Sequence, residues 1–277
     1  MKILILGGKG MAGHVMYSYL RKQADYDVFY TSRDRTDKDS IYLDVVDTSA
    51  LEQLINSLEP DIVINCTGIL NEAAEQNPLL AFRINSLLPH QLAAFMSRKK
   101  GRLIQISTDC VFSGKKGGYT ESDFRDGNSV YAQTKQLGEI TANPHLTIRT
   151  SIIGPELKKD GIGLFHWFMN QSGTIKGFER VYWNGVTTLE LAKATDFFIH
   201  QETSGLFHLC PPNKISKYDL LQLFKEIYQK DDIQIIPDAV QELDRTILNT
   251  RNSPAYAVPT FRDMLEEQKQ IYPLLVS

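Results

Sequence analysis

The sequence predicts an α/β protein with a doubly wound parallel sheet and a second, smaller α/β domain. Short apolar segments alternate with stretches of helical spacing through the first half of the chain, a rhythm typical of strands joined by crossover helices. Each short segment is apolar almost throughout, as strands covered on both faces are. The rhythm changes after Arg149, which indicates that another domain begins near that point.

The first half contains four expected strands and four expected helices. The strands are expected at Ile3–Leu6, Asp27–Thr31, Asp61–Asn65 and Arg102–Ser107. The helices are expected at Ala12–Lys22, Ala50–Ser57, Leu80–Arg98 and Val130–Ala142. Pro60 follows the second helix and supports its end there. Ligands of such sheets bind at the carboxyl ends of the strands, so the loops that follow the strands are the candidate site.

The second half is less regular. Helices are expected at Gly163–Gln171, at Thr187–His200 with Thr188 as its cap, and at Lys217–Gln229 after Ser216. The C-terminal segment beyond them shows no readable pattern. We therefore predict a first domain over residues 1–153 and a smaller domain over residues 154–277, with the return of residues 187–208 to the first domain left open.

Composition excludes several classes of protein. The 277 residues carry 30 Lys and Arg against 33 Asp and Glu, a net charge of −3, which argues against a protein that coats nucleic acid or an anionic membrane. Three distant cysteines and six scattered histidines predict neither a disulfide framework nor a metal site. The apolar start at Met1–Leu6 is too short for a signal peptide, so we expect a cytoplasmic protein without a membrane or nucleic-acid partner.

Gly7, Gly10 and Gly13 form a G-x-x-G-x-x-G motif between the first strand and the first helix. Glycine at these places permits a tight turn, close approach of the backbone to a pyrophosphate, and close packing of helix on strand. The phosphates then rest at the helix N-terminus, where free N–H groups favour negative charge. Its place directly after the first strand favours dinucleotide binding. The alternative is a simple strand–helix turn.

The end of the second expected strand distinguishes between the two nicotinamide cofactors. An acid there accepts the ribose 2′-hydroxyl of NAD, whereas arginine favours the 2′-phosphate of NADP. Arg33 stands at this place with Arg35 close by, which favours NADPH. Asp34 keeps NADH as an alternative, and a solvated charged turn is the other interpretation. Asp44 and Val45 are placed to bracket the adenine.

A hydroxyl group, a phenol and an amine are predicted to meet beside this cofactor. Tyr131 and Lys135 share a face of the expected fourth helix, and Thr108 ends the central strand. A free phenol titrates at about 10, so an ammonium one turn away is expected to lower its pKa. Tyr131 would then donate a proton to a carbonyl oxygen held by Thr108, while Lys135 serves Tyr131 and the nicotinamide ribose. The alternative is a packing tyrosine and a surface lysine.

Six motifs, in order, resemble the extended short-chain dehydrogenases/reductases, and within them the dTDP-4-dehydrorhamnose reductase group. They are the glycine motif, Asn65-Cys66-Thr67-Gly68, Arg83-Ile84-Asn85, Ser107-Thr108-Asp109-x-Val111-Phe112, Tyr131-x-x-x-Lys135 with Gly138-Glu139, and Arg149-Thr150-Ser151. The resemblance covers residues 1 to about 155 and is looser beyond. It implies a Rossmann dinucleotide-binding domain, a substrate domain, and NADPH-dependent reduction of a nucleotide-linked 4-keto-6-deoxy sugar, in deoxysugar biosynthesis for a surface polysaccharide or glycan.

The resemblance also implies residue roles. The catalytic residues would be Thr108, Tyr131 and Lys135. The cofactor would be held by Gly7, Gly10, Met11, Gly13, Arg33, Asp44, Val45, Thr67, Gly68 and Asn85, with Tyr131 and Lys135. The substrate would meet Asp109, Cys110, Val111, Phe112, Trp183 and Arg245. Arg245 would contact the substrate pyrophosphate or form a surface salt bridge. Trp183 would wall the sugar pocket or belong to the core.

Two positions depart from the group's pattern. Rhamnose reductases usually have Tyr where Cys110 stands and Trp where Ile152 stands, and both aromatics line the sugar pocket. The nucleotide, the sugar and the stereochemistry of the product are therefore open. Cys110 is interpreted as a small buried residue, with a catalytic acid as the alternative. The sequence does not tell the oligomeric state, a homodimer being one option.

Two other functions share these motifs. The nucleotide-sugar 4,6-dehydratases usually carry an Asp-Glu pair after the threonine, and Asp109-Cys110 lacks the second carboxylate; epimerases of the same fold remain an alternative. A non-catalytic NADP-binding regulatory subunit often loses part of the triad or of the glycine loop. Both are intact here, which favours the reductase.

Overall fold

The centre of the protein is a seven-stranded parallel sheet. The computed structural model describes residues 1–276, and the side chains of residues 1–271. The strand order is β10-β6-β5-β4-β1-β2-β3, and each neighbouring pair runs parallel. The strands are β1 (Lys2–Leu6), β2 (Asp27–Ser32), β3 (Ile41–Tyr42), β4 (Ile62–Asn65), β5 (Arg102–Thr108), β6 (Leu146–Thr150) and β10 (Gly205–His208). The predicted fold class is confirmed.

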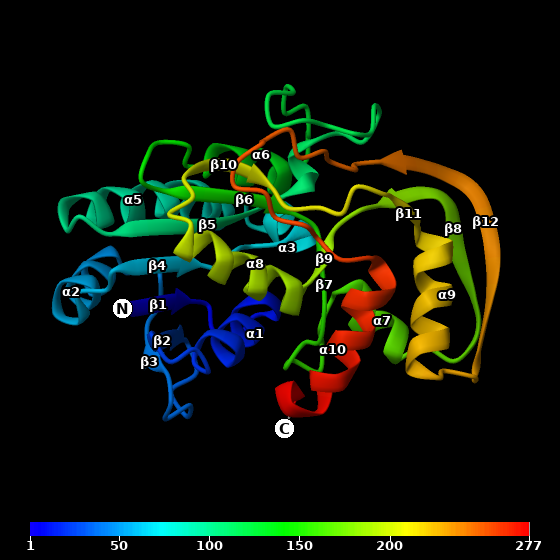
Figure 1. Cartoon of the computed structure of the whole chain (residues 1–277), viewed down its shortest axis with the longest axis horizontal. Helices are drawn as coiled ribbons and strands as arrows, with labels where there is room; N and C mark the ends of the chain where they lie inside the picture. The colour runs from blue at the N-terminus through cyan, green and yellow to red at the C-terminus, as the bar shows by residue number, and fades with distance from the viewer. Residues whose placement is uncertain (277) are drawn as a thin grey trace.

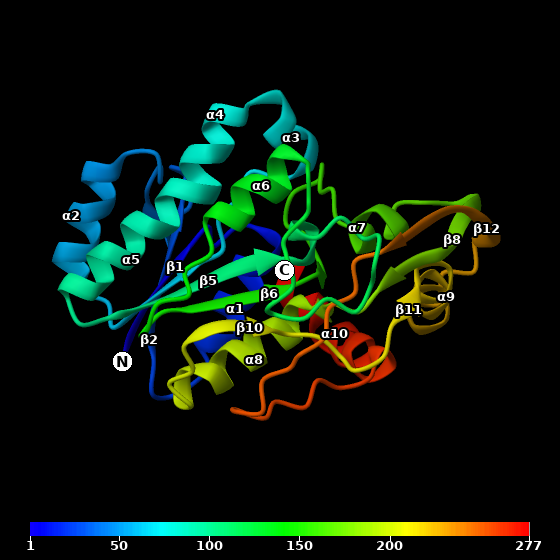
Figure 2. The ribbon, with the colours of Figure 1, turned by 90° about the horizontal axis from the view of Figure 1, so that it is seen from above.

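Helices cover both faces of this sheet (Figures 1 and 2). Ile3 and Ile5 of β1 point into one core, formed with α1 (Met11–Leu20) and α8 (Thr188–His200). Leu4 and Leu6 point into the other core, formed with α2 (Thr48–Leu58) and α5 (Leu88–Arg98). Because successive side chains of a strand alternate between faces, an unbroken apolar strand serves both cores.

Two predicted helices differ from the structure. The single helix expected at Leu80–Arg98 is instead α4 (Pro78–Ala81), a wider π-helical turn at Phe82–Leu87 and α5, with α3 (Asn71–Gln76) before them. The helix expected at Val130–Ala142 ends early, as α6 (Val130–Leu137). A Cβ atom at Gly138 would lie 1.8 Å from the Asn85 carbonyl oxygen. The chain therefore passes directly over the π-helical turn as α6 ends.

A smaller mixed sheet, of order β11-β8-β12, forms much of the second half. β11 runs antiparallel to β8, and β12 runs parallel to it. Its strands are β8 (Gly173–Trp183), β11 (Ile215–Ser216) and β12 (Ile233–Asp244). It packs with α7 (Leu164–Met169), α9 (Lys217–Tyr228) and α10 (Phe261–Val276) around a separate core. In Figure 2, the arrowhead of β5 points toward the side on which β8, β12 and α9 lie. The second half therefore faces the carboxyl ends of the parallel strands.

The structure also bears on the predicted helix caps and on the predicted division into domains. Thr187, not Thr188, caps α8, since its Oγ1 accepts a hydrogen bond of 3.1 Å from the Glu190 N–H. Ser216 caps α9 as predicted. A third small sheet pairs β7 (Ile152–Ile153) with β9 (Val186–Thr187), after which α8 and β10 lie with the first sheet. The division into two domains at residue 153 stays a prediction.

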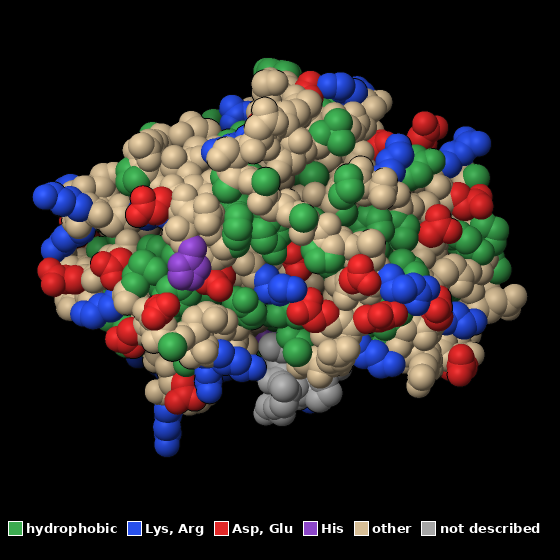
Figure 3. Space-filling view, in the orientation of Figure 1, with side chains coloured by type: hydrophobic (Ala, Val, Ile, Leu, Met, Phe, Trp, Pro, Cys, Tyr) green, Lys and Arg blue, Asp and Glu red, His purple; other side chains and the backbone are tan. Residues whose placement is uncertain are grey.

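The surface carries both signs of charge. Figure 3 shows Lys and Arg interspersed with Asp and Glu on the face it presents. Within residues 1–276, none of the helices is long and apolar enough to cross a membrane. The described part of the chain also contains no group of three or more His, Cys, Asp or Glu side chains that could hold a metal ion.

Candidate active site

Two adjoining cavities open at the carboxyl ends of the parallel strands. The first, of about 430 Å³, extends from the glycine loop to Arg33 and Asp44. The second, of about 590 Å³, extends from the same loop to Thr108 and Tyr131. The residues that line both are Lys9, Gly10, Cys66, Thr67, Gly68, Leu157 and Lys158. The cavities form one continuous groove at the edge where α/β sheets bind ligands.

The glycine loop has the shape of a phosphate cradle. Gly7 adopts a φ of +78°, and the Gly10 N–H donates to the Gly7 carbonyl at 2.9 Å. A Cβ at Gly13 would lie 2.2 Å from that same carbonyl oxygen, so only glycine lets α1 approach the loop. No side chain caps the N-terminus of α1. Its first N–H groups are therefore free to bind an anion.

At the end of the first cavity away from Tyr131, Asp34 and the two arginines, Arg33 and Arg35, contact different groups. The Asp34 carboxylate accepts from Thr36 Oγ1 at 2.6 Å and from Lys9 Nζ at 3.0 Å. Hydrogen bonds from Thr36 and Lys9 lower its pKa to about 2. The Arg35 guanidinium lies 3.9 Å from the Tyr42 ring centroid, so the expected second phosphate contact is not assembled. Arg33 lines the cavity alone among the arginines.

The remaining predicted cofactor residues fall into two groups. Asp44, Val45, Thr67, Gly68 and Met11 line the groove. Asn85 instead lies beneath it, buried, where its side chain hydrogen-bonds to the Ile69 N–H and carbonyl, each at 2.8 Å. Its amide also donates to Thr134 Oγ1 at 3.0 Å. Because these contacts occupy the side chain, Asn85 shapes the loop that lines the groove rather than the groove itself.

Thr108, Tyr131 and Lys135 line the second cavity together. Thr108 ends β5, where its Oγ1 accepts from the Cys110 N–H at 3.1 Å. Ser129 caps α6, so Tyr131 enters in the first turn of that helix. Lys135 follows one turn later, and its Nζ donates to the Ile106 carbonyl of β5 at 2.6 Å. The sheet and α6 thus bring the three predicted side chains to one place.

The pKa of Tyr131 differs from the expectation. Burial raises it, and Cys110 and Asp109 raise it further, while a hydrogen bond with Thr108 lowers it. Burial also lowers the pKa of Lys135 to about 8, although the electrostatic interactions with Glu139 and Cys66 act in the opposite direction. The prediction that Lys135 lowers the Tyr131 pKa is wrong for this arrangement. The phenol stays protonated over the ordinary pH range.

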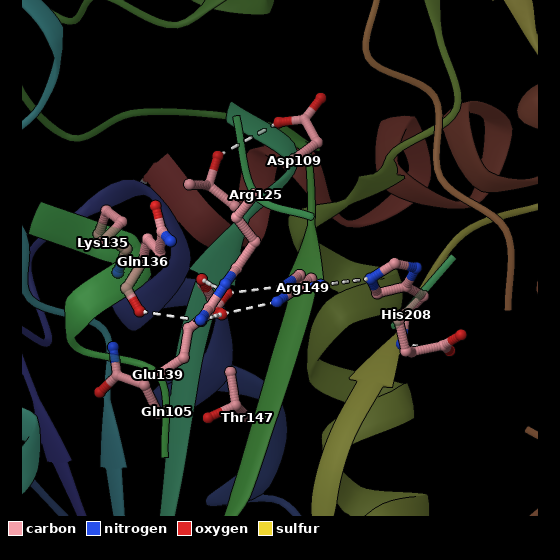
Figure 4. Close-up of polar contacts among 12 residues, drawn as sticks. Gln105, Asp109, Arg125, Lys135, Gln136, Glu139, Thr147, Arg149 and His208 are labelled. Atoms are coloured by element: carbon pink, nitrogen blue, oxygen red, sulfur yellow. Dashed lines mark hydrogen bonds and ion pairs between the residues drawn. The ribbon is translucent and has the colours of Figure 1, made fainter. Parts of the chain in front are cut away.

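A buried carboxylate supports the catalytic strand from below (Figure 4). Glu139 accepts from Ser107 Oγ at 2.7 Å, from Arg149 Nε at 2.6 Å and Nη2 at 2.7 Å, and from Arg125 Nη1 at 2.9 Å. Arg149 Nη1 also meets His208 Nε2 at 3.1 Å. Burial alone would raise the Glu139 pKa, but Arg149 and the other donors lower it. The sequence motifs contain Glu139 and Arg149, but no role was predicted for them.

The predicted substrate residues are only partly assembled at the cavity. Asp109 and Cys110 line it. Val111 and Phe112 are instead fully buried in a separate apolar cluster, with the Phe112 ring stacked 4.3 Å from that of Tyr119. Trp183 is buried in the second-half core, and its Nε1 donates to Ser151 Oγ at 2.9 Å. It therefore lies behind the cavity wall, which Ser151 forms.

Arg245 reaches the same region from the end of β12. Its Nε donates to the Phe112 carbonyl at 3.1 Å, and its Nη1 lies 3.9 Å from Cys110 Sγ. Within residues 1–271, its guanidinium forms no ion pair, so the surface salt bridge considered for it is absent there. Since Cys110 lines the second cavity, this contact places the guanidinium beside that cavity, although Arg245 is not one of its lining residues.

Sequence reasoning missed the segment of residues 154–163. Leu157 and Lys158 line both cavities, and Glu156 Oε1 accepts from the Gly163 N–H at 2.6 Å, which closes the segment into a loop. The sequence signal for this loop is its cluster of turn-forming residues. That cluster predicts a loop but not that the loop lies across the groove, because only the packing of the second half places it there.

Residues 1–257 match the family described as RmlD substrate binding domain. The chain belongs to this family. It is 27% identical over 276 residues to the probable low-salt glycan biosynthesis reductase Agl14 of Haloferax volcanii, a match that covers 91% of this chain and 89% of that protein.

Solved structures give the same result for the fold. A dTDP-4-dehydrorhamnose reductase of Clostridium acetobutylicum matches with a TM-score of 0.82 and 25% identity, covering 99% of this chain and 100% of that one. A dTDP-4-dehydrorhamnose reductase of Bacillus anthracis in complex with NADP matches with a TM-score of 0.84 and 20% identity, covering 97% and 98%. These matches extend through the second half, where the sequence motifs were sparse.

Proposed function

We propose that this family member is an NADPH-dependent reductase of a nucleotide-linked 4-keto-6-deoxy sugar, in deoxysugar biosynthesis for a surface polysaccharide or glycan. The observation that carries the proposal is the convergence of Thr108, Tyr131 and Lys135 on a cavity continuous with the glycine loop. A relative that matches nearly the whole chain is named a glycan biosynthesis reductase. A structural neighbour of full length is named a dTDP-4-dehydrorhamnose reductase.

The groove suits a dinucleotide with a 2′-phosphate. The uncapped N-terminus of α1 and the glycine loop would hold the diphosphate. Arg33 would meet the 2′-phosphate, because the neighbouring Asp34 carboxylate is paired with Lys9 and hydrogen-bonded by Thr36, which weakens its repulsion of the phosphate. Asp44 and Val45 would bracket the adenine. The B. anthracis neighbour binds NADP, and NADH is the alternative that a direct comparison tests.

The side chains in the second cavity would complete the reduction. Bound NADPH supplies the hydride that reaches the carbonyl carbon. Tyr131, kept protonated by burial, would donate its proton to the carbonyl oxygen, so that the ketone becomes an alcohol. Thr108 would donate a hydrogen bond to the same oxygen, and Lys135 would hold the cofactor ribose while anchored to β5 through the Ile106 carbonyl.

Elimination and a purely regulatory role have less support. A 4,6-dehydratase needs a second acid or base after Asp109, and Cys110 stands there. Burial raises the pKa of the Cys110 thiol to about 12, so it stays neutral and is a poor base. A regulatory subunit would not require three catalytic side chains to converge. We further propose that the enzyme acts in the cytoplasm on its nucleotide-sugar partner, with a homodimer as the assembly to test in solution.

Turnover tests the proposal directly. The purified protein is mixed with NADPH and, in separate assays, with dTDP-, UDP-, GDP- and CDP-linked 4-keto-6-deoxy sugars, and NADPH oxidation is followed. We expect oxidation with at least one of them, and Tyr131→Phe should reduce that turnover by about 10²–10⁴. Oxidation of none of them, or turnover by Tyr131→Phe equal to that of the wild type, would rule out the proposed reaction.

A further inference from the structure

A row of buried polar side chains crosses the middle of the parallel sheet. Asn65 of β4, Gln105 of β5 and Thr147 of β6 are paired in register on adjacent strands, and each is at most 1% exposed. Figure 4 shows Gln105 and Thr147 next to each other. We call these three residues the polar row. Because buried polar groups oppose folding unless they are hydrogen-bonded, their presence in largely apolar strands indicates a role beyond packing.

A chain of hydrogen bonds joins the polar row to the groove. The Thr67 N–H and Oγ1 both donate to Asn65 Oδ1, at 3.1 and 2.6 Å. Asn65 Nδ2 donates to Gln105 Oε1 at 2.8 Å, and Gln105 Nε2 donates to the Ile106 carbonyl at 3.0 Å. That carbonyl also accepts from Lys135 Nζ. The chain therefore connects Thr67, which lines both cavities, to the backbone group that anchors Lys135.

Backbone groups at the two ends fix the direction of every bond in this chain. The Ile106 carbonyl can only accept, so the Gln105 amide must present its nitrogen there and its oxygen to Asn65. The Thr67 N–H can only donate, so the Asn65 amide must present its oxygen to Thr67. The Thr67 hydroxyl has a single hydrogen, which it donates to that same oxygen. Only the lone pairs of Thr67 Oγ1 then remain for a ligand in the groove.

We propose that Asn65 and Gln105 are positioning residues that make the Thr67 hydroxyl a hydrogen-bond acceptor for the bound cofactor. The inference rests on the proposed function, in which NADPH fills the groove. The partner of Thr67 on the cofactor must be a donor, which means a ribose hydroxyl or the carboxamide N–H group. Phosphate oxygens are acceptors, so the diphosphate is excluded as this partner.

Cofactor affinity measured without turnover tests this assignment. NADPH is titrated into the protein, and its binding is followed by fluorescence. We expect Thr67→Val, which keeps the shape and removes the hydroxyl, to weaken NADPH by about three- to tenfold, the loss typical of one hydrogen bond. Thr67→Ser, which keeps the hydroxyl, should retain most of the affinity.

A double-mutant cycle distinguishes a positioning role from a structural one. Asn65→Leu is combined with Gln105→Leu, so that neither amide side chain is left without its partner. The combined variant should weaken NADPH by about twofold or more, and by no more than Thr67→Val does. In the Thr67→Val background it should cause no further loss, because its effect on the cofactor passes through the hydroxyl. A merely structural role predicts the same additional loss in both backgrounds.

Thr147→Val is the matched control. Thr147 belongs to the same polar row, but its Oγ1 donates to the Ile140 carbonyl at 2.7 Å and accepts from the Ile140 N–H at 2.9 Å. It does not line the groove. Its replacement should lower stability and leave the NADPH affinity unchanged. Thermal unfolding checks that each variant is folded at the temperature of the titration.

An analogue identifies the donor on the cofactor. In the acetylpyridine analogue of NADP, a methyl group replaces the carboxamide nitrogen and its hydrogens. If Thr67→Val weakens NADP but not this analogue, the donor is the carboxamide. If Thr67→Val weakens both alike, the donor is a ribose hydroxyl.

Other results would overturn the assignment. It is wrong if Thr67→Val binds NADPH as tightly as the wild type, or if the losses in the cycle are fully additive. A wild-type protein that does not bind NADPH would contradict both this inference and the proposed function. A protein that binds NADPH through Thr67 but reduces no nucleotide sugar would contradict the reductase and leave this inference in place.

Discussion

Lys135 has a charge that changes near neutral pH. Burial lowers its pKa from 10.5 to about 8, so between these values the unfolded chain binds a proton that the folded chain has lost. Stability should therefore rise with pH across this window. Turnover should do the opposite and fall as the pH rises through about 8, because the ammonium is the form that we propose to bind the cofactor ribose. A pH profile of kcat/KM measures this, and Lys135→Met should show low turnover without that decline.

Arg33 is the residue that we propose to set the cofactor preference. Losing a charge-assisted hydrogen bond of about 1.5–3 kcal/mol should reduce kcat/KM for NADPH in Arg33→Ala by about 10–100-fold. The value for NADH should change little, since NADH has no 2′-phosphate. Steady-state kinetics with both cofactors measures the ratio. Arg35→Ala is the control, because its guanidinium lies over Tyr42; an equal loss in both variants would remove the specific role of Arg33.

At the scale of elements, four of the seven parallel strands were predicted, whereas β3, β6, β10 and the smaller sheet were not. β1, β2, β4 and β5 appear within one residue of their expected ends, because strands covered on two faces must be apolar throughout. β8 and β12 expose many of their residues irregularly, so neither a continuous nor an alternating apolar pattern marks them. The π-helical turn at Phe82–Leu87 was also invisible, because helical periodicity continues across it. The site divides in the same way: motifs beside the parallel strands were found, whereas Leu157 and Lys158 reach the groove only through the packing of the second half.

The cap of α8 gives a test at this scale. Thr187 Oγ1 accepts from the Glu190 N–H, whereas the buried Thr188 Oγ1 has no hydrogen-bond partner. Thr187→Ala should therefore lower the free energy of unfolding by about 1 kcal/mol, the usual contribution of an N-cap. Thr188→Ala should lower the free energy of unfolding by less, because it removes a hydroxyl that has no hydrogen-bond partner. Urea denaturation of the two variants measures the difference, and a larger loss in Thr188→Ala would show that the cap is assigned to the wrong threonine.

Across the whole molecule, Glu139 connects the catalytic strand to three other parts of the chain. Its carboxylate joins Ser107 of β5 to Arg149 of β6 and to Arg125, and Arg149 continues to His208 of β10. Glu139→Gln keeps the shape but leaves the buried Arg149 without its counter-charge. We expect a loss of about 3–5 kcal/mol in the free energy of unfolding, as for a broken buried ion pair.

Glu59→Gln is the control for this last variant, because Glu59 forms an exposed ion pair with Lys99 at 3.5 Å. Such surface pairs contribute about 0–1 kcal/mol. Denaturant unfolding measures both variants. The Lys135 pKa gives an independent readout, since Glu139 raises it and its loss should move the decline in turnover to lower pH. A Glu139→Gln protein as stable as Glu59→Gln, with an unchanged pH profile, would show that the carboxylate neither stabilises the sheet nor acts on the triad.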